Sequence, residues 1–288
     1  MFKKSLVTVA AICAPLAGSA LAADLPSHKG PPPAFVPPPP APAWTGFYVG
    51  LNAGYTFSDS NSVRIASSPL LPSAGVVAWA AGANAIAPVQ TDGFIGGGQI
   101  GYNVQFANSF VAGLEADIQG VASDGGSSVA ATALPFRTNT FFTTLTTRKT
   151  LDYLGTVRGR LGFLVTPSLL IYGTGGLAYG GVQTSASVFQ FSALNGVFGS
   201  GAGSFSDTRV GWAAGGGAEW LFLPNWSAKI EYLYYDLGSV VSQFALAGPP
   251  APIPFAVSQS TSRFNGHLVR AGLNYHFNLG PDLVVAKY

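Results

Sequence analysis

The sequence predicts an all-β protein, an eight-stranded antiparallel up-and-down β-barrel that crosses a membrane. Hydrophobic residues make up 48% of the 288-residue chain and charged residues only 9%. After the first 22 residues, however, no run of about 20 apolar residues lacks a Pro or Gly break, which excludes membrane-spanning helices. Strands that alternate apolar and polar side chains resolve this conflict, because one face of each strand meets lipid and the other faces the lumen.

The N-terminus has the pattern of a secretory signal peptide. Lys3 and Lys4 precede an apolar run over residues 6–16, and small residues then lead to Ala22. A short apolar run between a basic start and a small-residue site is typical of export signals and is too short for a spanning helix. We therefore expect residues 1–22 to be removed and the mature chain to be exported.

Export also fixes the charge and the cysteine content of the mature chain. Without Lys3 and Lys4 the 14 Lys and Arg residues fall to 12, equal to the 12 Asp and Glu residues. A chain with zero net charge is not expected to bind nucleic acid. Cys13 lies in the signal and is the only cysteine, so disulfides, thiolate metal sites and cysteine catalysis are excluded.

Residues 23–43 are rich in proline, with runs at 31–33 and 37–40. Such a segment favours an extended polyproline conformation without a core. We interpret it as a periplasmic tether that precedes the barrel, and a motif for a proline-recognition domain is the alternative. The barrel is expected over residues 44–277, followed by a C-terminal tail over 278–288.

Eight segments of alternating pattern follow the tether, and the connections between them alternate in length. The segments cover residues 44–57, 92–106, 109–121, 150–165, 168–182, 208–223, 225–239 and 263–277. The connections after the second, fourth and sixth segments are tight, whereas those at 58–91, 122–149, 183–207 and 240–262 are long. Outer-membrane barrels have short periplasmic turns and long extracellular loops. Both termini are therefore expected in the periplasm.

Side-chain parity assigns the two faces of each strand, because successive residues of a strand point in opposite directions. In the first segment Phe47 and Leu51 share the face assigned to lipid, whereas Tyr48 and Asn52 share the face assigned to the lumen. Aromatic side chains on the lipid face gather near the strand ends, as expected at bilayer interfaces. The periplasmic girdle is predicted to contain Trp44, Phe47, Phe106, Trp220, Phe222, Trp226, Tyr275 and Phe277.

Eight charged residues have the parity of the lumen and fall at similar depths. Four acids and four bases are expected to form one paired layer: Glu115, Asp117, Arg158, Arg160, Glu219, Lys229, Glu231 and Arg270. Charges at membrane depth are tolerated when they face the interior and find partners. An eight-stranded barrel is just wide enough for side chains to fill it. The layer is thus expected to plug the lumen, and a gate whose pairs exchange partners to open an ion path is the alternative.

Neither catalysis nor a bound cofactor is expected. Of the three histidines, His28 lies in the tether, His267 points outward and His276 points inward, and none has neighbours at metal-ligand spacing. A Ser-His-acid arrangement that uses His267 at the outer leaflet is the enzymatic alternative. We predict that the chain is not an enzyme and holds no metal or cofactor.

Two of the long connections are unusually apolar. Residues 70–89 and 244–257 carry few charges and many aliphatic side chains. Such stretches either fold back over the barrel mouth or contact a partner or membrane, and both interpretations stay open. An unknown surface ligand could therefore bind through the loops at 58–91 and 240–262.

Four segments carry a family resemblance: residues 44–50 (WTGFYVG), 151–162 (LDYLGTVRGRLG), 171–180 (IYGTGGLAYG) and 268–275 (LVRAGLNY). They resemble the small alphaproteobacterial outer-membrane protein family, the porin-like surface antigens related to OmpA-type eight-stranded barrels. It implies a surface-exposed protein of the Gram-negative outer membrane that contacts lipid and lipopolysaccharide and supports envelope integrity. Some relatives bind hemin or host surfaces. The loops at 58–91 and 122–149 contain no His or Tyr to serve as an axial ligand of the hemin iron, so the sequence gives little support for hemin binding.

Such barrels often end on an aromatic residue that the barrel assembly machinery reads. Here Phe277 is followed by eleven residues, so either Phe277 or Tyr288 is expected to take that role. Three hypotheses for function follow: a structural surface barrel closed by its charged layer, a narrow porin-like channel gated by that layer, and an adhesin or ligand-binding protein acting through its loops.

Overall fold

The computed structural model of the chain describes residues 44–123, 125–248 and 253–277. The expected signal peptide, tether and C-terminal tail lie outside these residues. Almost all of the described chain is β-strand, and no helix within it is long and apolar enough to cross a membrane.

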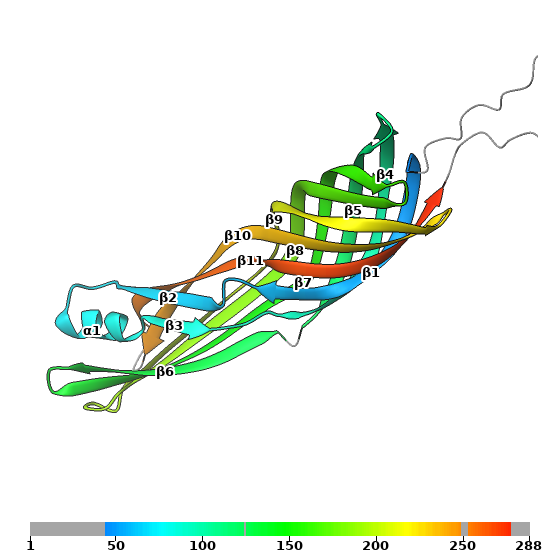
Figure 1. The fold of residues 1–288 in the computed structure, drawn as a ribbon. Coiled ribbons are helices and arrows are strands. Elements are labelled where there is room, and N and C mark those ends of the chain that lie inside the picture. The colour runs from blue at the N-terminus through cyan, green and yellow to red at the C-terminus, as the bar shows by residue number, and fades with distance from the viewer. Residues whose placement is uncertain (1–43, 124, 249–252, 278–288) are drawn as a thin grey trace, which may run out of the picture. The chain divides into compact units, whose positions relative to one another are not determined.

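Eight antiparallel strands form a closed ring (Figure 1). Each strand pairs with the next member of the ring along the chain, and β1 pairs with β11 from Phe47 opposite Phe277 to Ser58 opposite Gly266. The ring strands are β1 (Gly46–Ser58), β4 (Gly93–Phe106), β5 (Phe110–Ala122), β7 (Asn139–Thr166), β8 (Leu169–Ser192), β9 (Phe198–Leu223), β10 (Trp226–Gly248) and β11 (Ile253–Phe277). The predicted all-β barrel is confirmed, but the sheet contains eleven strands in total.

Burial along β1 follows the predicted parity. Tyr48, Asn52 and Thr56 are buried in the lumen, whereas Leu51 is 74% exposed on the outer face of the ring. Exposed aliphatic and aromatic side chains recur on the outer face of every ring strand. This inversion, with apolar groups outside and polar groups inside, is typical of barrels that stand in lipid.

The strands of the ring are longer than the sequence pattern indicated at one end. Residues 139–149, 183–192, 198–207, 240–248 and 253–262 were expected to be loops, but they continue β7, β8, β9, β10 and β11. They alternate small polar residues with aliphatic or aromatic ones, as in the segment NTFFTTLTTRK of β7. Continued pairing with neighbouring strands satisfies the backbone hydrogen bonds that a loop would leave to water.

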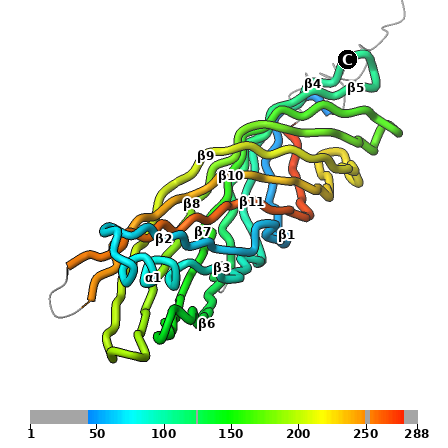
Figure 2. The backbone as a smooth tube through the Cα atoms, turned by 90° about the vertical axis from the view of Figure 1, so that its left-hand side faces the viewer, coloured from blue at the N-terminus to red at the C-terminus, as the bar shows by residue number. Residues whose placement is uncertain are grey.

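Four further elements complete this end of the molecule, which we call the extension. They are β2 (Ser62–Pro69), α1 (Ala74–Gly82), β3 (Ala85–Pro88) and β6 (Gly126–Phe136). Strand β2 pairs with β11, β3 pairs with β2, and β6 pairs with β7. Figures 1 and 2 show these elements gathered at the opposite end of the strands from the β4–β5 turn.

The extension has a hydrophobic core of its own. Val63, Ile65, Leu145, Val188 and other aliphatic side chains from β2, β7 and β8 are almost fully buried there. Helix α1 closes this core, and its Trp79 ring lies 5.1 Å from Phe141. The apolar stretch 70–89 therefore folds back in part, although Leu70, Leu71, Val77 and Ile86 remain exposed.

We expect Leu145→Ala to destabilise the extension by about 2–5 kcal/mol, because it leaves a cavity in this core. Limited proteolysis of refolded protein should then cut within residues 126–148 at lower urea concentrations than in the wild type. Val129→Ala is the matched control, because Val129 is 69% exposed on neighbouring β6. Equal urea sensitivity of the two variants would contradict a packed core in the extension.

Candidate functional site

The structure brings the eight charged side chains of the predicted layer together in the lumen. They project from five strands of the ring, and each residue is at most 4% exposed. Strand β5 supplies Glu115 and Asp117, β7 supplies Arg158 and Arg160, β9 supplies Glu219, β10 supplies Lys229 and Glu231, and β11 supplies Arg270. Four acids meet four bases, so their formal charges cancel.

Glu115 is the centre of the cluster because it contacts all four bases. Its carboxylate oxygens lie 2.7 Å from Arg158 Nη2 and 2.8 Å from Lys229 Nζ. Arg270 and Arg160 are 3.4 and 3.6 Å away. Arg158 is its direct neighbour across the β5–β7 ladder, whereas Lys229 and Arg270 approach from β10 and β11.

Arg158 and Arg270 share two further carboxylates of the cluster, those of Asp117 and Glu231. Arg158 and Arg270 each lie 2.9 Å from Asp117. They also lie 3.0 and 2.5 Å from opposite oxygens of Glu231. The two like charges are tolerated side by side because carboxylates bridge them, and planar guanidinium groups suit such multiple contacts.

Glu219 forms a second centre toward the turn end of the lumen. Arg160 Nη2 lies 2.5 Å from its Oε2. Its Oε1 accepts hydrogen bonds from Ser227 at 2.6 Å and Asn274 at 2.7 Å, and His276 Nε2 lies 3.4 Å away. The carboxylate is therefore surrounded by donors, as a buried charge requires.

The hydroxyl groups of Tyr48, Tyr172 and Thr156 also belong to the network, and they were not anticipated from the sequence as members of it. Tyr48 donates to Glu115 at 2.7 Å and accepts from Arg160 at 3.0 Å. Tyr172 donates to Glu231 at 3.0 Å, and Thr156 donates to Asp117 at 2.7 Å. The side-chain parity of the first strand already directs Tyr48 into the lumen. A hydroxyl buried there needs a polar partner, so its membership could have been predicted.

One member of the predicted aromatic girdle lies elsewhere. Trp44 is 1% exposed and closes the turn end of the lumen, where its Nε1 donates to the carbonyl of Pro167 at 3.0 Å. Its position has the same parity as Tyr48, so the local pattern directed it inward. The other predicted girdle residues lie on the outer face and are exposed or half-buried: Phe47, Phe106, Trp220, Phe222, Trp226, Tyr275 and Phe277.

An apolar layer fills the lumen between the charged cluster and the extension. Its buried members include Leu154, Leu233, Leu237, Phe264 and Leu268, each at most 3% exposed. They come from β7, β10 and β11, so the layer reaches across the ring. Water and ions that passed the charged cluster would meet this layer next.

Lys149 lies buried on the extension side of the apolar layer. Its ammonium donates to the carbonyls of Ser60 at 2.9 Å and Arg263 at 2.6 Å, and it lies 4.7 Å from the centre of the Phe264 ring. Among the described residues no carboxylate lies within ion-pair distance of it. Burial lowers the pKa of Lys149 to about 8, because desolvation penalises the charged form.

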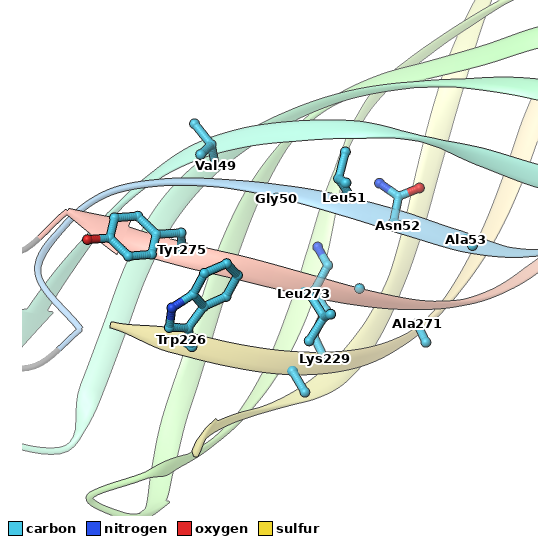
Figure 3. Close-up of a pocket in the computed structure, with 12 residues that line it drawn as sticks. Val49, Gly50, Leu51, Asn52, Ala53, Trp226, Lys229, Ala271, Leu273 and Tyr275 are labelled. Atoms are coloured by element: carbon cyan, nitrogen blue, oxygen red, sulfur yellow. The ribbon is translucent and has the colours of Figure 1, made fainter. Parts of the chain in front are cut away.

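A hollow of about 890 Å³ lies on the outer wall of the ring, and Lys229 of the charged cluster is among its lining residues (Figure 3). Val49, Leu51, Leu273 and the rings of Trp226 and Tyr275 border it, and small side chains of β1, β10 and β11 form its floor. The lining is almost entirely apolar. Lipid chains are its natural filling in a membrane, and its two polar lining residues, Asn52 and Lys229, are bound to Gln99 and Glu115 in the lumen.

The two histidines that the structure describes, His267 and His276, do not form a reactive site. Ser227 Oγ lies 2.9 Å from His276 Nε2, but the Ser227 hydroxyl hydrogen-bonds to Glu219 and all three residues are buried. His267 instead lies on the outer face, where its Nδ1 is 2.7 Å from the Tyr232 hydroxyl and its ring stacks on the same tyrosine. This pair has the character of an interfacial anchor.

Residues 14–277 match the family model described as the outer membrane protein beta-barrel domain. The chain belongs to this family. It is therefore an outer-membrane β-barrel, and the predicted localisation is confirmed.

Relatives place the chain among alphaproteobacterial surface proteins. It is 34% identical over 283 residues to the 31 kDa outer-membrane immunogenic protein of Brucella melitensis, covering 94% of this chain and 99% of the relative. It is 29% identical over 205 residues to the 22 kDa outer membrane protein of Rhizobium leguminosarum, covering 70% and 69% of the two chains. The predicted family resemblance is thus confirmed.

A comparison of structures finds outer-membrane proteins as well. OprG from Pseudomonas aeruginosa covers 81% of this chain and 97% of its own, with a TM-score of 0.38 and 11% identity. At this level of similarity nothing about the activity of OprG is transferred to this chain.

We expect Glu115→Gln to lower the free energy of unfolding by about 3–5 kcal/mol, because it leaves buried bases without their shared carboxylate. Urea unfolding in lipid vesicles, followed by tryptophan fluorescence, measures the change. Asp152→Asn is the control, since Asp152 is exposed and accepts a hydrogen bond from Gln183 where the ring meets the extension. Adding Lys229→Met to Glu115→Gln should recover part of the loss, and equal midpoints for Glu115→Gln and wild type would contradict the assignment.

Lys149 should make the stability depend on pH in the alkaline range. Its folded pKa is about 8, below the value of about 10.4 in an unfolded chain. The unfolded state therefore binds more protons between these values, and stability should rise as the pH increases from about 8 to 10. The thermal midpoint should rise in the wild type and stay comparatively flat in Lys149→Met, and parallel curves would count against a buried charged lysine.

Proposed function

We propose that this protein is a closed surface barrel that supports the outer envelope and does not conduct ions. In this proposal the eight ring strands span the membrane, the short turns face the periplasm, and the extension stands outside the cell. The apolar outer face of the ring and the three short turns at one end support this orientation. Lipid and lipopolysaccharide surround the ring, and the assembly machinery reads Phe277 or Tyr288 as its terminal aromatic.

The observation that carries this proposal is the apolar layer above the charged cluster. A gate built from the ion pairs alone would require that their rearrangement open a continuous polar path. Leu154, Leu233 and Leu268 are each at most 1% exposed in the next layer, and exchange of ion-pair partners leaves them in place. The core of the extension and helix α1 add a further apolar barrier. The closed scaffold is therefore favoured over the gated channel.

Planar-bilayer recording of refolded protein tests this proposal. We expect no discrete conductance from the wild type or from Glu231→Gln, because the apolar layer still seals the lumen when the charged cluster loses a carboxylate. Leu233→Ser with Leu268→Ser is the comparison, since it adds hydroxyls to that layer and should admit leak currents. Discrete openings in the wild type that change with Glu231→Gln would favour the gated channel instead.

A second candidate function is ligand binding through the extension. Leu71, Val77 and Ile253 are 57%, 43% and 69% exposed at the far end of the molecule. Exposed apolar groups outside the membrane are typical of interaction surfaces. Cells that express Leu71→Ser with Ile253→Ser should lose adhesion to host surfaces while the barrel stays folded, and unchanged adhesion would remove this candidate.

A further inference from the structure

Charges are separated by level along the molecule. Asp59, Asp92, Asp152, Asp207 and Asp236 all lie where the ring meets the extension, a level that we call the rim. Beyond the rim, residues 60–91, 125–151, 183–206 and 237–262 contain no Asp or Glu, but they contain Arg64, Arg137, Arg148 and Lys149. Among the described residues the extension therefore carries only positive formal charge, and Asp124 in the β5–β6 connection lies outside them.

Arg148 projects outward from β7 with no partner within the described chain. It makes no ion pair or hydrogen bond with any described side chain, whereas Arg137 stacks over Phe136 and Lys149 is buried. An exposed guanidinium with five free donors is suited to phosphate and carboxylate groups. Among the residues that the structure describes, Arg148 is thus an exposed cation without an acidic partner.

The wall around Arg148 is built of hydroxyl groups. Strand register places Ser127, Arg148, Ser185 and Ser204 in one row across β6, β7, β8 and β9. The next row away from the rim contains Thr146 and Ser187, and together these residues line an open groove of about 440 Å³. Farther out, Phe142, Phe191 and Phe198 form an exposed aromatic row. Hydroxyls and exposed rings beside a cation are suited to an anionic saccharide.

The groove lies just outside the expected membrane surface. Arg148 is four residues beyond Asp152 and five beyond Tyr153, which spans roughly 13–17 Å along an extended strand. Tyr153 lies on the outer face near the rim, where interfacial aromatic residues are expected. In the outer leaflet of a Gram-negative membrane, the level above the lipid phosphates is occupied by the saccharide core of lipopolysaccharide, which is rich in hydroxyls and negative charge.

We propose that the groove of β6–β9 binds the inner-core oligosaccharide of a lipopolysaccharide molecule in the same membrane. Arg148 contacts a phosphate or carboxylate of the core, and Ser185, Ser187 and Thr146 exchange hydrogen bonds with sugar hydroxyls. Arg148 lies beyond the rim, so its charge is placed to act above the level of the lipid A phosphates. This inference rests on the orientation in the proposed function and adds a partner and a site to it.

Titration of the refolded mature chain in detergent tests the proposal with two probes. One is rough lipopolysaccharide with a phosphorylated inner core, and the other is lipid A alone. We expect the wild type to bind the core-bearing form at least roughly tenfold more tightly, as a charge-assisted contact allows. Arg148→Gln should abolish most of this difference, and Ser187→Val should reduce it.

Arg137→Gln is the matched control, because it removes the same charge at the tip of the β6–β7 hairpin, eleven residues from Arg148. It should keep the preference for the core. Equal affinity of the wild type for both probes, or equal weakening by Arg137→Gln and Arg148→Gln, would overturn the proposal. Equal weakening by the two variants would mean that lipopolysaccharide is attracted by the positive charge of the extension as a whole and not by a defined groove.

Surface labelling separates this inference from the proposed function. The mature chain is expected to contain no cysteine, so Val129→Cys on exposed β6 gives a single thiol beside the groove. Labelling of whole cells by an impermeant maleimide is expected, and failure of labelling would overturn the orientation on which both proposals rest. Efficient labelling together with equal affinity for the two probes would overturn the lipopolysaccharide site alone.

Discussion

Closure of the sheet between β1 and β11 is the constraint on which the rest of the structure depends. Lipid offers no hydrogen-bonding partners, so a membrane-spanning sheet must pair every strand and leave no edge. The ladder from Phe47 and Phe277 to Ser58 and Gly266 meets this requirement. Closure then divides every strand into an outer and an inner face, and it fixes which side chains must share a narrow lumen.

The narrow lumen explains why the interior is arranged in layers. Glu115 and the four bases around it can be buried because Glu115 lies within ion-pair distance of all four bases, so every base has a carboxylate partner. Leucine and phenylalanine side chains pack above them, and Trp44 closes the turn end. A lumen filled in this way is a packed core, which is why the proposed role is that of a scaffold and surface protein.

The outer face of β7 changes character along its length. Val157 and Leu161 are exposed apolar groups on the ring, whereas Thr144 and Thr146 occupy the same face on the extension. The inward face of β7 shows the reverse change. It carries charged residues in the ring, whereas in the extension its Leu145 belongs to a hydrophobic core. The ring and the extension therefore share strands, but the outer face is apolar on the ring and polar on the extension. The aspartates of the rim lie between the two parts.

The sequence by itself determined the alternation of faces, the positions of the ring strands and the inward direction of the eight charged residues. These properties depend on the two-residue period of a strand, which is local. It did not indicate that residues 139–149 continue a strand, because a pattern rich in Thr and Ser is compatible with a loop until a partner strand is present. Only the tertiary structure decided that Glu115 meets four bases at once, that Trp44 enters the lumen and that an apolar layer seals it. Those outcomes depend on the register and closure of the ring, which bring together residues as far apart in the sequence as Phe47 and Phe277.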